Sequence, residues 1–266
     1  MTSPRSVLLI TLDSCRYDAF TAAAAPNMKA VGKLHRAQAP ANFTYGSHAS
    51  MFVGFTPGVP DRAEPYVNPK YARIFKLDMQ GFAGMAEPFF TLAGRSIVDG
   101  FRRKGYRALG SAAMSWFDPA TEAGRILIKD FDEFHYVARK GLAHQLAWAE
   151  QQMAGVKDAP LFLFLNIGET HVPYWHEGAD WDAKVNPCRP FRGAANDAAE
   201  CRRRQIACIE YVDRLLGPLL ARFAAATTVL CADHGDCWGE DGLWEHGVTH
   251  PKVMEVPLLF RLGARD

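Results

Sequence analysis

Apolar residues gather in short runs along the chain, and these runs predict strands buried inside a sheet. A run of four to eight apolar residues bounded by turn residues is typical of a strand that is covered on both faces. The runs are Ser6 to Leu12, Tyr106 to Ala112, Pro160 to Ile167, Thr227 to Ala232, and the stretch PLLFRL that follows Val256. Because strands covered on both faces belong mainly to parallel sheets, the pattern favours a parallel sheet.

Between these runs the apolar residues recur every three or four positions, which is typical of amphipathic helices. This spacing covers Leu92 to Lys104, Gly141 to Met153, and a longer segment with apolar positions from Ile209 to Phe223. Pro218 lies in the longer segment, and we expect it to kink or interrupt that helix because proline has no backbone N–H. The alternation predicts an α/β fold: a three-layer sandwich with a central, mostly parallel sheet and helices on both faces.

Two stretches between the predicted elements have no such period. Phe55 to Pro88 is rich in Gly and Pro, and Glu169 to Gly193 contains Trp175, Trp181 and several prolines. Long loops are uncommon in compact domains unless they bind something or are disordered. We interpret both stretches as walls or lids of a site.

Length and composition narrow the class of protein. With 266 residues the chain can bury a sizeable core, and we expect residues 1–266 to form a single domain. A formal net charge of +1 gives no electrostatic reason to expect a nucleic acid or an anionic membrane as partner. The apolar run before Asp13 is too short for a signal sequence, and the six cysteines lack CxxC pairs. We therefore expect no membrane association and a cytoplasmic location.

Ionisable residues directly follow three of the predicted strands. Asp13 follows the first, Glu169 and His171 follow the third, and Asp233 and His234 follow the fourth. Ligands of open parallel sheets collect beyond the carboxyl ends of the strands, so we expect these side chains to converge. Each residue alone has a structural interpretation as a cap or a core histidine. Together they favour a divalent cation such as Mn²⁺, Zn²⁺, Mg²⁺ or Ca²⁺.

The segment ANFTYGSHASMFVG supplies a candidate nucleophile. A polar cluster from Thr44 to Ser47 precedes a helical pattern that starts near His48. Backbone N–H groups at a helix start can hold an oxyanion next to the Thr44 hydroxyl. The alternative is a plain capping motif with Ser47 as the N-cap.

Six stretches, taken in order, resemble the sulfatase-like branch of the alkaline phosphatase superfamily. They are VLLITLDSCRYDAF, PNMKAVGKLHRAQAPANFTYGSHASMFVG, TLAGRSIVDGFRRKGYRA, LFLFLNIGETHVPY, IEYVDRLLGPLL, and TTVLCADHGDCWGEDGLWEHG followed by VPLLFR. The resemblance implies an alkaline phosphatase-like fold in which Asp13, Asp233 and His234 are metal ligands. It also implies that Thr44 is the metal-bound nucleophile.

The same resemblance implies that His171 and His246 contact the oxyanion or the leaving group of the substrate. In sulfatases the position of Thr44 holds a Cys or Ser that is converted to formylglycine in a CxPSR motif, and here Gly46 and His48 replace the Pro and Arg of that motif. A threonine cannot form the aldehyde hydrate. The chain thus resembles the phosphoryl-transfer members, such as nucleotide phosphodiesterases and phosphoglycerol or phosphoethanolamine transferases.

These inferences predict a metal-dependent hydrolase or phosphotransferase that acts on a small-molecule phosphoester through a phosphothreonine intermediate at Thr44. A free threonine hydroxyl is a poor nucleophile, and a bound cation lowers its pKa. Two other functions stay open: a sulfate or phosphonate ester hydrolase with the same site, and a catalytically silent metal or anion binder.

We expect one divalent ion, Mn²⁺ or Zn²⁺ before Ca²⁺ or Mg²⁺, and a second ion near His171, His176 and His246 stays open. Asp236 and Glu240 are candidates for orienting His234. Relatives usually continue past the VPLLFR stretch into a smaller carboxyl-terminal subdomain. We expect this subdomain to be lacking, and the site to be open or completed by another subunit, for example in a homo-oligomer.

Overall fold

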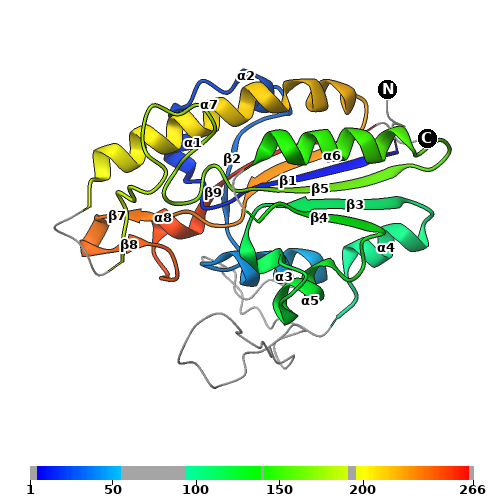
Figure 1. Ribbon diagram of the computed structural model, residues 1–266, viewed down its shortest axis with the longest axis horizontal. Coiled ribbons are helices and arrows are strands. Elements are labelled where there is room, and N and C mark those ends of the chain that lie inside the picture. The colour runs from blue at the N-terminus through cyan, green and yellow to red at the C-terminus, as the bar shows by residue number, and fades with distance from the viewer. Residues whose placement is uncertain (1–4, 55–93, 139–140, 191–195, 264–266) are drawn as a thin grey trace, which may run out of the picture.

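In the part of the chain that the structure describes, the central element is a seven-stranded sheet with the strand order β2-β9-β6-β1-β5-β3-β4 (Figure 1). The computed structural model describes residues 5–54, 94–138, 141–190 and 196–263, so the Phe55 to Pro88 stretch lies outside the described residues. The strands of this sheet are β1 (Val7–Leu12), β2 (His35–Gln38), β3 (Arg107–Ala112), β4 (Glu133–Tyr136), β5 (Leu161–Ile167), β6 (Thr227–Ala232) and β9 (Glu255–Arg261). Strand β9 runs antiparallel to β6 and β2, and the other pairs are parallel, which confirms the mostly parallel sheet.

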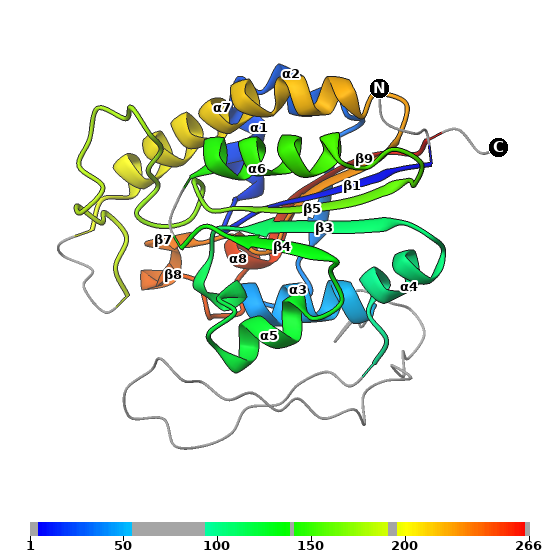
Figure 2. The same cartoon turned by 45° about the vertical axis from the view of Figure 1, so that its right-hand side comes forward.

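Helices cover both faces of this sheet, as Figures 1 and 2 show, and the three-layer prediction is confirmed. One face carries α1 (Tyr17–Ala22), α2 (Pro26–Lys29), α6 (Leu142–Ala154) and α7 (Ala198–Arg222). The other carries α3 (Thr44–Val53), α4 (Ile97–Arg103) and α5 (Glu122–Ile128). The short elements are the 3-10 helices Ser115–Phe117 and Glu240–Gly242, the hairpin strands β7 (Cys237–Trp238) and β8 (Trp244–Glu245), and α8 (Pro251–Met254).

Strand β5 shows how the sequence divides the core between the two faces. Its side chains alternate, because successive residues of a strand point to opposite sides. Leu163 and Leu165 belong to the core under α6 and α7, while Phe162 and Phe164 belong to the aromatic core on the side of α3, α4 and α5. An unbroken apolar run is therefore what a strand between two helical layers requires.

We expected Pro218 to kink or interrupt helix α7, and the structure shows no interruption. The helix runs from Ala198 to Arg222 with Pro218 inside. A proline inside a helix costs about 3 kcal/mol. The buried positions Ile209, Val212, Leu216 and Leu219 each contribute about 1.5–3 kcal/mol by leaving water. Packing against the sheet therefore outweighs the missing hydrogen bond.

Several boundaries differ from the predictions. Strands β2 (HRAQ) and β4 (EFHY) were not predicted, because both lie at a sheet edge and lack an apolar run. Helix α4 begins at Ile97 rather than Leu92; residues 92–93 lie outside the described part. The described part of the Glu169 to Gly193 stretch, up to residue 190, contains no helix or strand, as expected.

Candidate metal centre and active site

Asp13 and Asp233 lie side by side at the carboxyl ends of neighbouring parallel strands. Leu12 of β1 is in register with Ala232 of β6, so the next residue of each strand leaves the sheet at the same level. Ser14 follows in a left-handed conformation (φ 57°). Its backbone N–H donates to Oδ1 of Asp233 at 3.1 Å, which ties the two strand ends together. The predicted convergence of Asp13, Asp233 and His234 is thus present in the structure.

Thr44 is the first residue of α3, and its side chain lies next to Asp13 and His234. Its Oγ1 lies 3.4 Å from both carboxylate oxygens of Asp13 and 3.3 Å from Nε2 of His234. The helix begins at Thr44, not near His48 as expected. Ser47 is not an N-cap: it lies inside the helix, and its hydroxyl donates to the carbonyl of Asp233 at 2.7 Å, which holds α3 against the end of β6.

The start of α3 leaves backbone donors beside the Thr44 hydroxyl. The first intrahelical hydrogen bond runs from the N–H of Ser47 to the carbonyl of Phe43, so the amides of Thr44, Tyr45 and Gly46 precede the hydrogen-bonded part of the helix. At Gly46 a Cβ atom would lie 2.7 Å from the Phe43 ring, so only glycine fits there. This helix start can therefore receive an anion, as the sequence predicts.

The charged groups of this cluster are fully buried, and burial shifts their pKa values. Asp13, Asp233 and His234 are each 0% exposed. Desolvation raises the pKa of Asp13 to about 8, and the nearby Asp233 carboxylate adds to the rise. Desolvation likewise raises the pKa of Asp233 to about 7 and lowers that of His234 to about 4. Two buried carboxylates and a neutral imidazole are an unfavourable set without a counter-charge.

The donor set fits a four-coordinate divalent ion. Ligand atoms of Asp13, Asp233 and His234 all lie within 4.8 Å of one another. His234 Nε2 is 3.9 Å from Oδ1 of Asp13 and 3.5 Å from Oδ2 of Asp233. With bonds of about 2.1 Å, the ligands of a tetrahedral zinc ion are about 3.4 Å apart. Oδ2 of Asp233 is buried and accepts no hydrogen bond from the described residues, so it has a lone pair left for a cation.

Neighbouring groups orient these ligands toward their common centre. The Nδ1 side of His234 faces the carbonyl of Gly235 at 3.0 Å, which leaves Nε2 directed at Thr44. The side-chain amide of Asn166 donates to Oδ2 of Asp13 at 3.1 Å. Asn166 was not predicted as a site residue, although it is the one polar residue in the run PLFLFLNI.

The hairpin of β7 and β8 brings His246 to the site. Cys237 pairs with Glu245, which places the adjacent residues Asp236 and His246 together. Nδ1 of His246 lies 2.7 Å from Oδ1 of Asp236. Burial opposes the charged form of His246, but the hydrogen bond and charge of Asp236 outweigh it and raise the pKa of His246 to about 9. Asp236 therefore orients His246, and the expectation that it orients His234 is wrong.

His171 completes a group of three imidazoles. The ring centroid of His246 is 4.4 Å from that of His234 and 5.3 Å from that of His171. His176 is not in this group; its ring stacks on Tyr211 at 4.4 Å. A second set of potential ligands, His234, Asp236 and His246, shares His234 with the first set.

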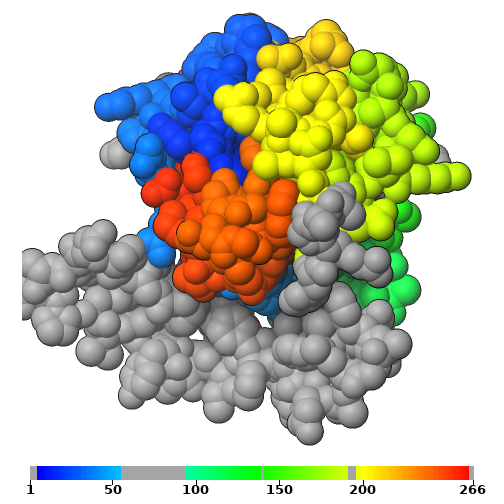
Figure 3. All heavy atoms as spheres, turned by 90° about the vertical axis from the view of Figure 1, so that its left-hand side faces the viewer, coloured from blue at the N-terminus to red at the C-terminus, as the bar shows by residue number. Residues whose placement is uncertain are grey.

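The remaining candidates from the sequence lie around this centre. Glu240 accepts from the guanidinium of Arg16 at 2.7 Å, so it does not orient His234. Glu169 accepts from the backbone of Leu142 at 2.8 Å and supports the start of α6. Figure 3 views the molecule from the carboxyl ends of the parallel strands, and the segment that follows β6 (orange) lies in the middle of this face, beside α1 (blue) and the start of α7 (yellow).

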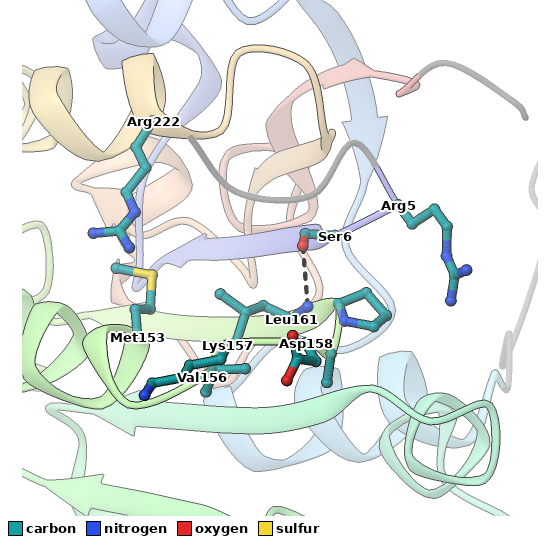
Figure 4. A pocket seen from close by; sticks show the side chains of 10 residues that line it. Arg5, Ser6, Met153, Val156, Lys157, Asp158, Leu161 and Arg222 are labelled. Atoms are coloured by element: carbon teal, nitrogen blue, oxygen red, sulfur yellow. Dashed lines mark hydrogen bonds between the residues drawn. The ribbon is translucent and has the colours of Figure 1, made fainter.

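A cavity of about 250 Å³ lies at the opposite end of the sheet. It is lined by residues at the amino ends of β1 and β5, among them Arg5, Ser6 and Leu161, and by Arg222 from α7 (Figure 4). The hydroxyl of Ser6 accepts from the backbone N–H of Leu161 at 3.0 Å. Since Asp13 follows the other end of β1, this cavity is separate from the candidate metal centre.

Comparisons with known proteins give structural matches only. No protein-family model matches the sequence, and no curated protein sequence matches it. The C-terminal periplasmic domain of phosphoethanolamine transferase EptC from Campylobacter jejuni matches with a TM-score of 0.66 and 13% identity, over 98% of this chain and 80% of that chain. The C-terminal periplasmic domain of EcEptC from Escherichia coli, in complex with Zn, matches with a TM-score of 0.64 and 12% identity, over 99% and 74%.

A third match identifies the fold. A protein in the alkaline phosphatase superfamily from Vibrio parahaemolyticus has a TM-score of 0.58 and 13% identity, over 99% of this chain and 61% of that chain. The chain therefore has the fold of the alkaline phosphatase superfamily, and the resemblance inferred from the sequence is confirmed at the level of the fold.

The expectation of a cytoplasmic location is contradicted by these neighbours, since two of them are periplasmic domains. The cysteine pattern does not indicate the compartment of this protein. All six cysteines are buried, and a thiol shielded from solvent oxidants says little about the compartment. Within the residues that the structure describes, no helix is long and apolar enough to span a membrane.

Proposed function

We propose that this protein transfers or hydrolyses a phosphoester by means of Thr44 and one divalent ion held by Asp13, Thr44, Asp233 and His234. The observation that carries the proposal is the convergence of these residues from three separate segments on one buried point, with separations of 3.3 to 3.9 Å. When bound, the ion lowers the pKa of the threonine hydroxyl and neutralises charge on a phosphoryl oxygen.

The residues of the chain then divide the reaction between them. The Thr44 hydroxyl loses its proton to solvent, Oγ1 attacks phosphorus, the bond from phosphorus to the leaving oxygen breaks, and a phosphothreonine forms. The amides at the start of α3 donate to a phosphoryl oxygen. His246, charged through its hydrogen bond to Asp236, gives a proton to the departing oxygen. Water or an acceptor alcohol then attacks phosphorus and gives its proton to His246, the bond from phosphorus to Oγ1 breaks, and the Thr44 oxygen regains a proton from solvent.

Hydrolysis and transfer share this first half-reaction, so the same site supports both. The Campylobacter jejuni neighbour is named a phosphoethanolamine transferase. A small-molecule phosphoester is accordingly the substrate class that we propose for this chain, and zinc is the first ion to test because the Escherichia coli neighbour was solved as a Zn complex. One ion is preferred over two because the second set of potential ligands shares His234 with the first.

Turnover of para-nitrophenyl phosphate and bis-para-nitrophenyl phosphate by the zinc- or manganese-loaded protein tests this function. We expect release of nitrophenol that stops when a chelator is added. A parallel assay with nitrophenyl sulfate and a phenylphosphonate ester separates the sulfate or phosphonate hydrolase from the phosphoester enzyme. Loaded protein that turns over none of the four esters would favour the silent metal or anion binder.

A further inference from the structure

Tyr174 lies at a junction between the two segments that carry His171 and His246. Its side chain is completely buried. Its hydroxyl donates to Oδ2 of Asp236 at 2.7 Å and accepts from Nε1 of Trp238 at 2.8 Å. Its backbone N–H donates to the carbonyl of His171 at 2.8 Å. A single residue is thereby connected to both histidines.

The backbone of Tyr174 is held in a conformation that aromatic residues seldom adopt. Its φ is 53°, in the left-handed region. Such a conformation persists only where the surroundings over-determine it, and it occurs often at functional sites. Here the indole N–H of Trp181 also donates to the Tyr174 carbonyl at 2.8 Å. The hydrogen-bonding groups of Tyr174 are therefore engaged on the main chain and on the side chain alike.

The connection from Tyr174 to His246 runs through a buried carboxylate. Oδ2 of Asp236 accepts from Tyr174, and Oδ1 lies 2.7 Å from Nδ1 of His246. Both oxygens of Asp236 are thus used, and the carboxylate has one orientation in which it satisfies both partners. Since Nδ1 of His246 is fixed by this contact, its Nε2 is the atom left to face a ligand.

His171 and His246 are far apart in the sequence but close together in space. They are 75 positions apart in the sequence, yet their ring centroids are 5.3 Å apart beside His234. His171 lies in an irregular segment, and His246 directly follows β8 of the two-stranded hairpin; neither the segment nor the hairpin belongs to the main sheet. The contacts of Tyr174 link these two elements to each other.

We propose that Tyr174 is a positioning residue of this site: through Asp236 and through the His171 carbonyl, it holds the two imidazoles at the spacing that a phosphoryl group and its leaving oxygen require. This inference rests on the proposed function. It adds that the leaving-group side of the site is built from the segment after β5 and the hairpin after β6 together. Among the described residues, Tyr174 makes no hydrogen bond to the proposed metal ligands Asp13, Thr44, Asp233 and His234.

The experiment compares Tyr174→Phe with Tyr106→Phe in the full chain loaded with zinc. Each change removes one hydroxyl; that of Tyr106 donates to the carbonyl of Arg5 at 2.8 Å, at the amino end of β3. We measure bound zinc, kcat and KM with phenyl phosphate, a poor leaving group, and with para-nitrophenyl phosphate, a good one. A nitrogen–proton correlation spectrum of the imidazole groups reports the environment of His246 without any need for turnover.

For Tyr174→Phe we expect full zinc content, a loss of about tenfold or more in kcat/KM for the phenyl ester, and a smaller loss for the nitrophenyl ester. We also expect a shifted His246 signal. Tyr106→Phe leaves both esters and the signal unchanged. Equal losses on both esters, or full activity with an unchanged His246 signal, would overturn the role of Tyr174.

If Tyr174→Phe does not fold, the variant Asp236→Asn tests the same proposal. Because Tyr174 is proposed to act through Asp236, Asp236→Asn gives the same selective loss on the phenyl ester. Where both single variants fold, the double variant is no worse than Asp236→Asn alone. Additive losses contradict the proposal. If the wild-type protein turns over neither ester, the proposed function fails, and the imidazole spectrum alone then decides whether Tyr174 positions His246.

Discussion

The backbone N–H of Ser14 donates to Oδ1 of Asp233 at 3.1 Å, and so the residue that follows Asp13 binds the second carboxylate of the cluster. This contact joins the ends of β1 and β6 without using the Asp233 oxygen that faces His234. One oxygen of Asp233 is therefore structural, and the other is available to a cation.

Removing one carboxylate should empty the metal centre. For Asp13→Ala we expect the affinity of the protein for zinc or manganese to fall at least 100-fold. One charged ligand is lost, while Asp233 stays buried. Elemental analysis of the dialysed protein and chelator competition measure the effect. Asp99→Ala is the matched control, since Asp99 forms a surface ion pair with Arg103. Unchanged metal affinity in Asp13→Ala would exclude Asp13 as a ligand.

The metal-free protein should lose stability as the pH rises from about 6.5 to 9. The pKa values of Asp13 and Asp233 are raised to about 8 and about 7, chiefly by desolvation, and that of His246 is raised to about 9 by Asp236. In this window the folded state binds more protons than the unfolded state, so the free energy of unfolding decreases with pH.

The buried residues His48 and His234 do not change the direction of this pH dependence between about pH 6.5 and 9. Desolvation lowers the pKa of His48 and His234 to about 4, so their contribution changes between about pH 4 and 6.5 and is flat above it. Urea titrations at several pH values measure the slope. Saturating zinc should reduce or reverse it, because the metal binds the deprotonated ligands. A metal-free protein that becomes more stable from pH 6.5 to 9 would contradict the burial of these carboxyls without a counter-charge.

Thr44→Ala should abolish turnover while the protein stays folded. We expect a loss of about 1,000-fold or more in kcat, because the attacking hydroxyl is gone. Thr44→Ser keeps the hydroxyl and should retain measurable activity. Mass spectrometry of acid-quenched wild-type enzyme should find one phosphoryl group on the peptide that contains Thr44. Full turnover by Thr44→Ala, or a phosphoryl group on another residue, would rule out Thr44 as the nucleophile.

His48 should support the nucleophile by holding the backbone of Thr44. Its Nδ1 lies 2.7 Å from the Thr44 carbonyl, its Nε2 lies 2.9 Å from the Thr11 hydroxyl, and its ring packs edge-on against Phe117. His48→Leu leaves two buried polar groups without this partner and should cost about 2–4 kcal/mol in the free energy of unfolding. His35→Leu, which alters a partly exposed ring stacked on Phe260, should cost far less. Equal costs in urea unfolding would contradict this role.

The sequence was sufficient to predict the site residues that directly follow buried strands. Asp13, Asp233 and His234 come directly after apolar runs, and parallel topology brings such positions together. Thr44 was located by its motif, although its helix starts earlier than expected, because a short polar cluster does not reveal which residue begins the first turn.

The contacts made between loops could not be predicted in this way. The pairing of Asp236 with His246 depends on the register of a hairpin whose strands are only two residues long. The role of Tyr174 depends on side-chain hydrogen bonds between segments far apart in the sequence. Neither leaves a periodic pattern. The edge strands β2 and β4 were missed for a related reason, because polar residues are tolerated where one side of a strand faces solvent.

The most direct test of the metal centre is anomalous diffraction from crystals of the zinc-loaded protein. We expect one strong peak within about 2.3 Å of ligand atoms from Asp13, Thr44, Asp233 and His234. No peak among these four side chains, or a peak only at another position in the molecule, would contradict the proposed site.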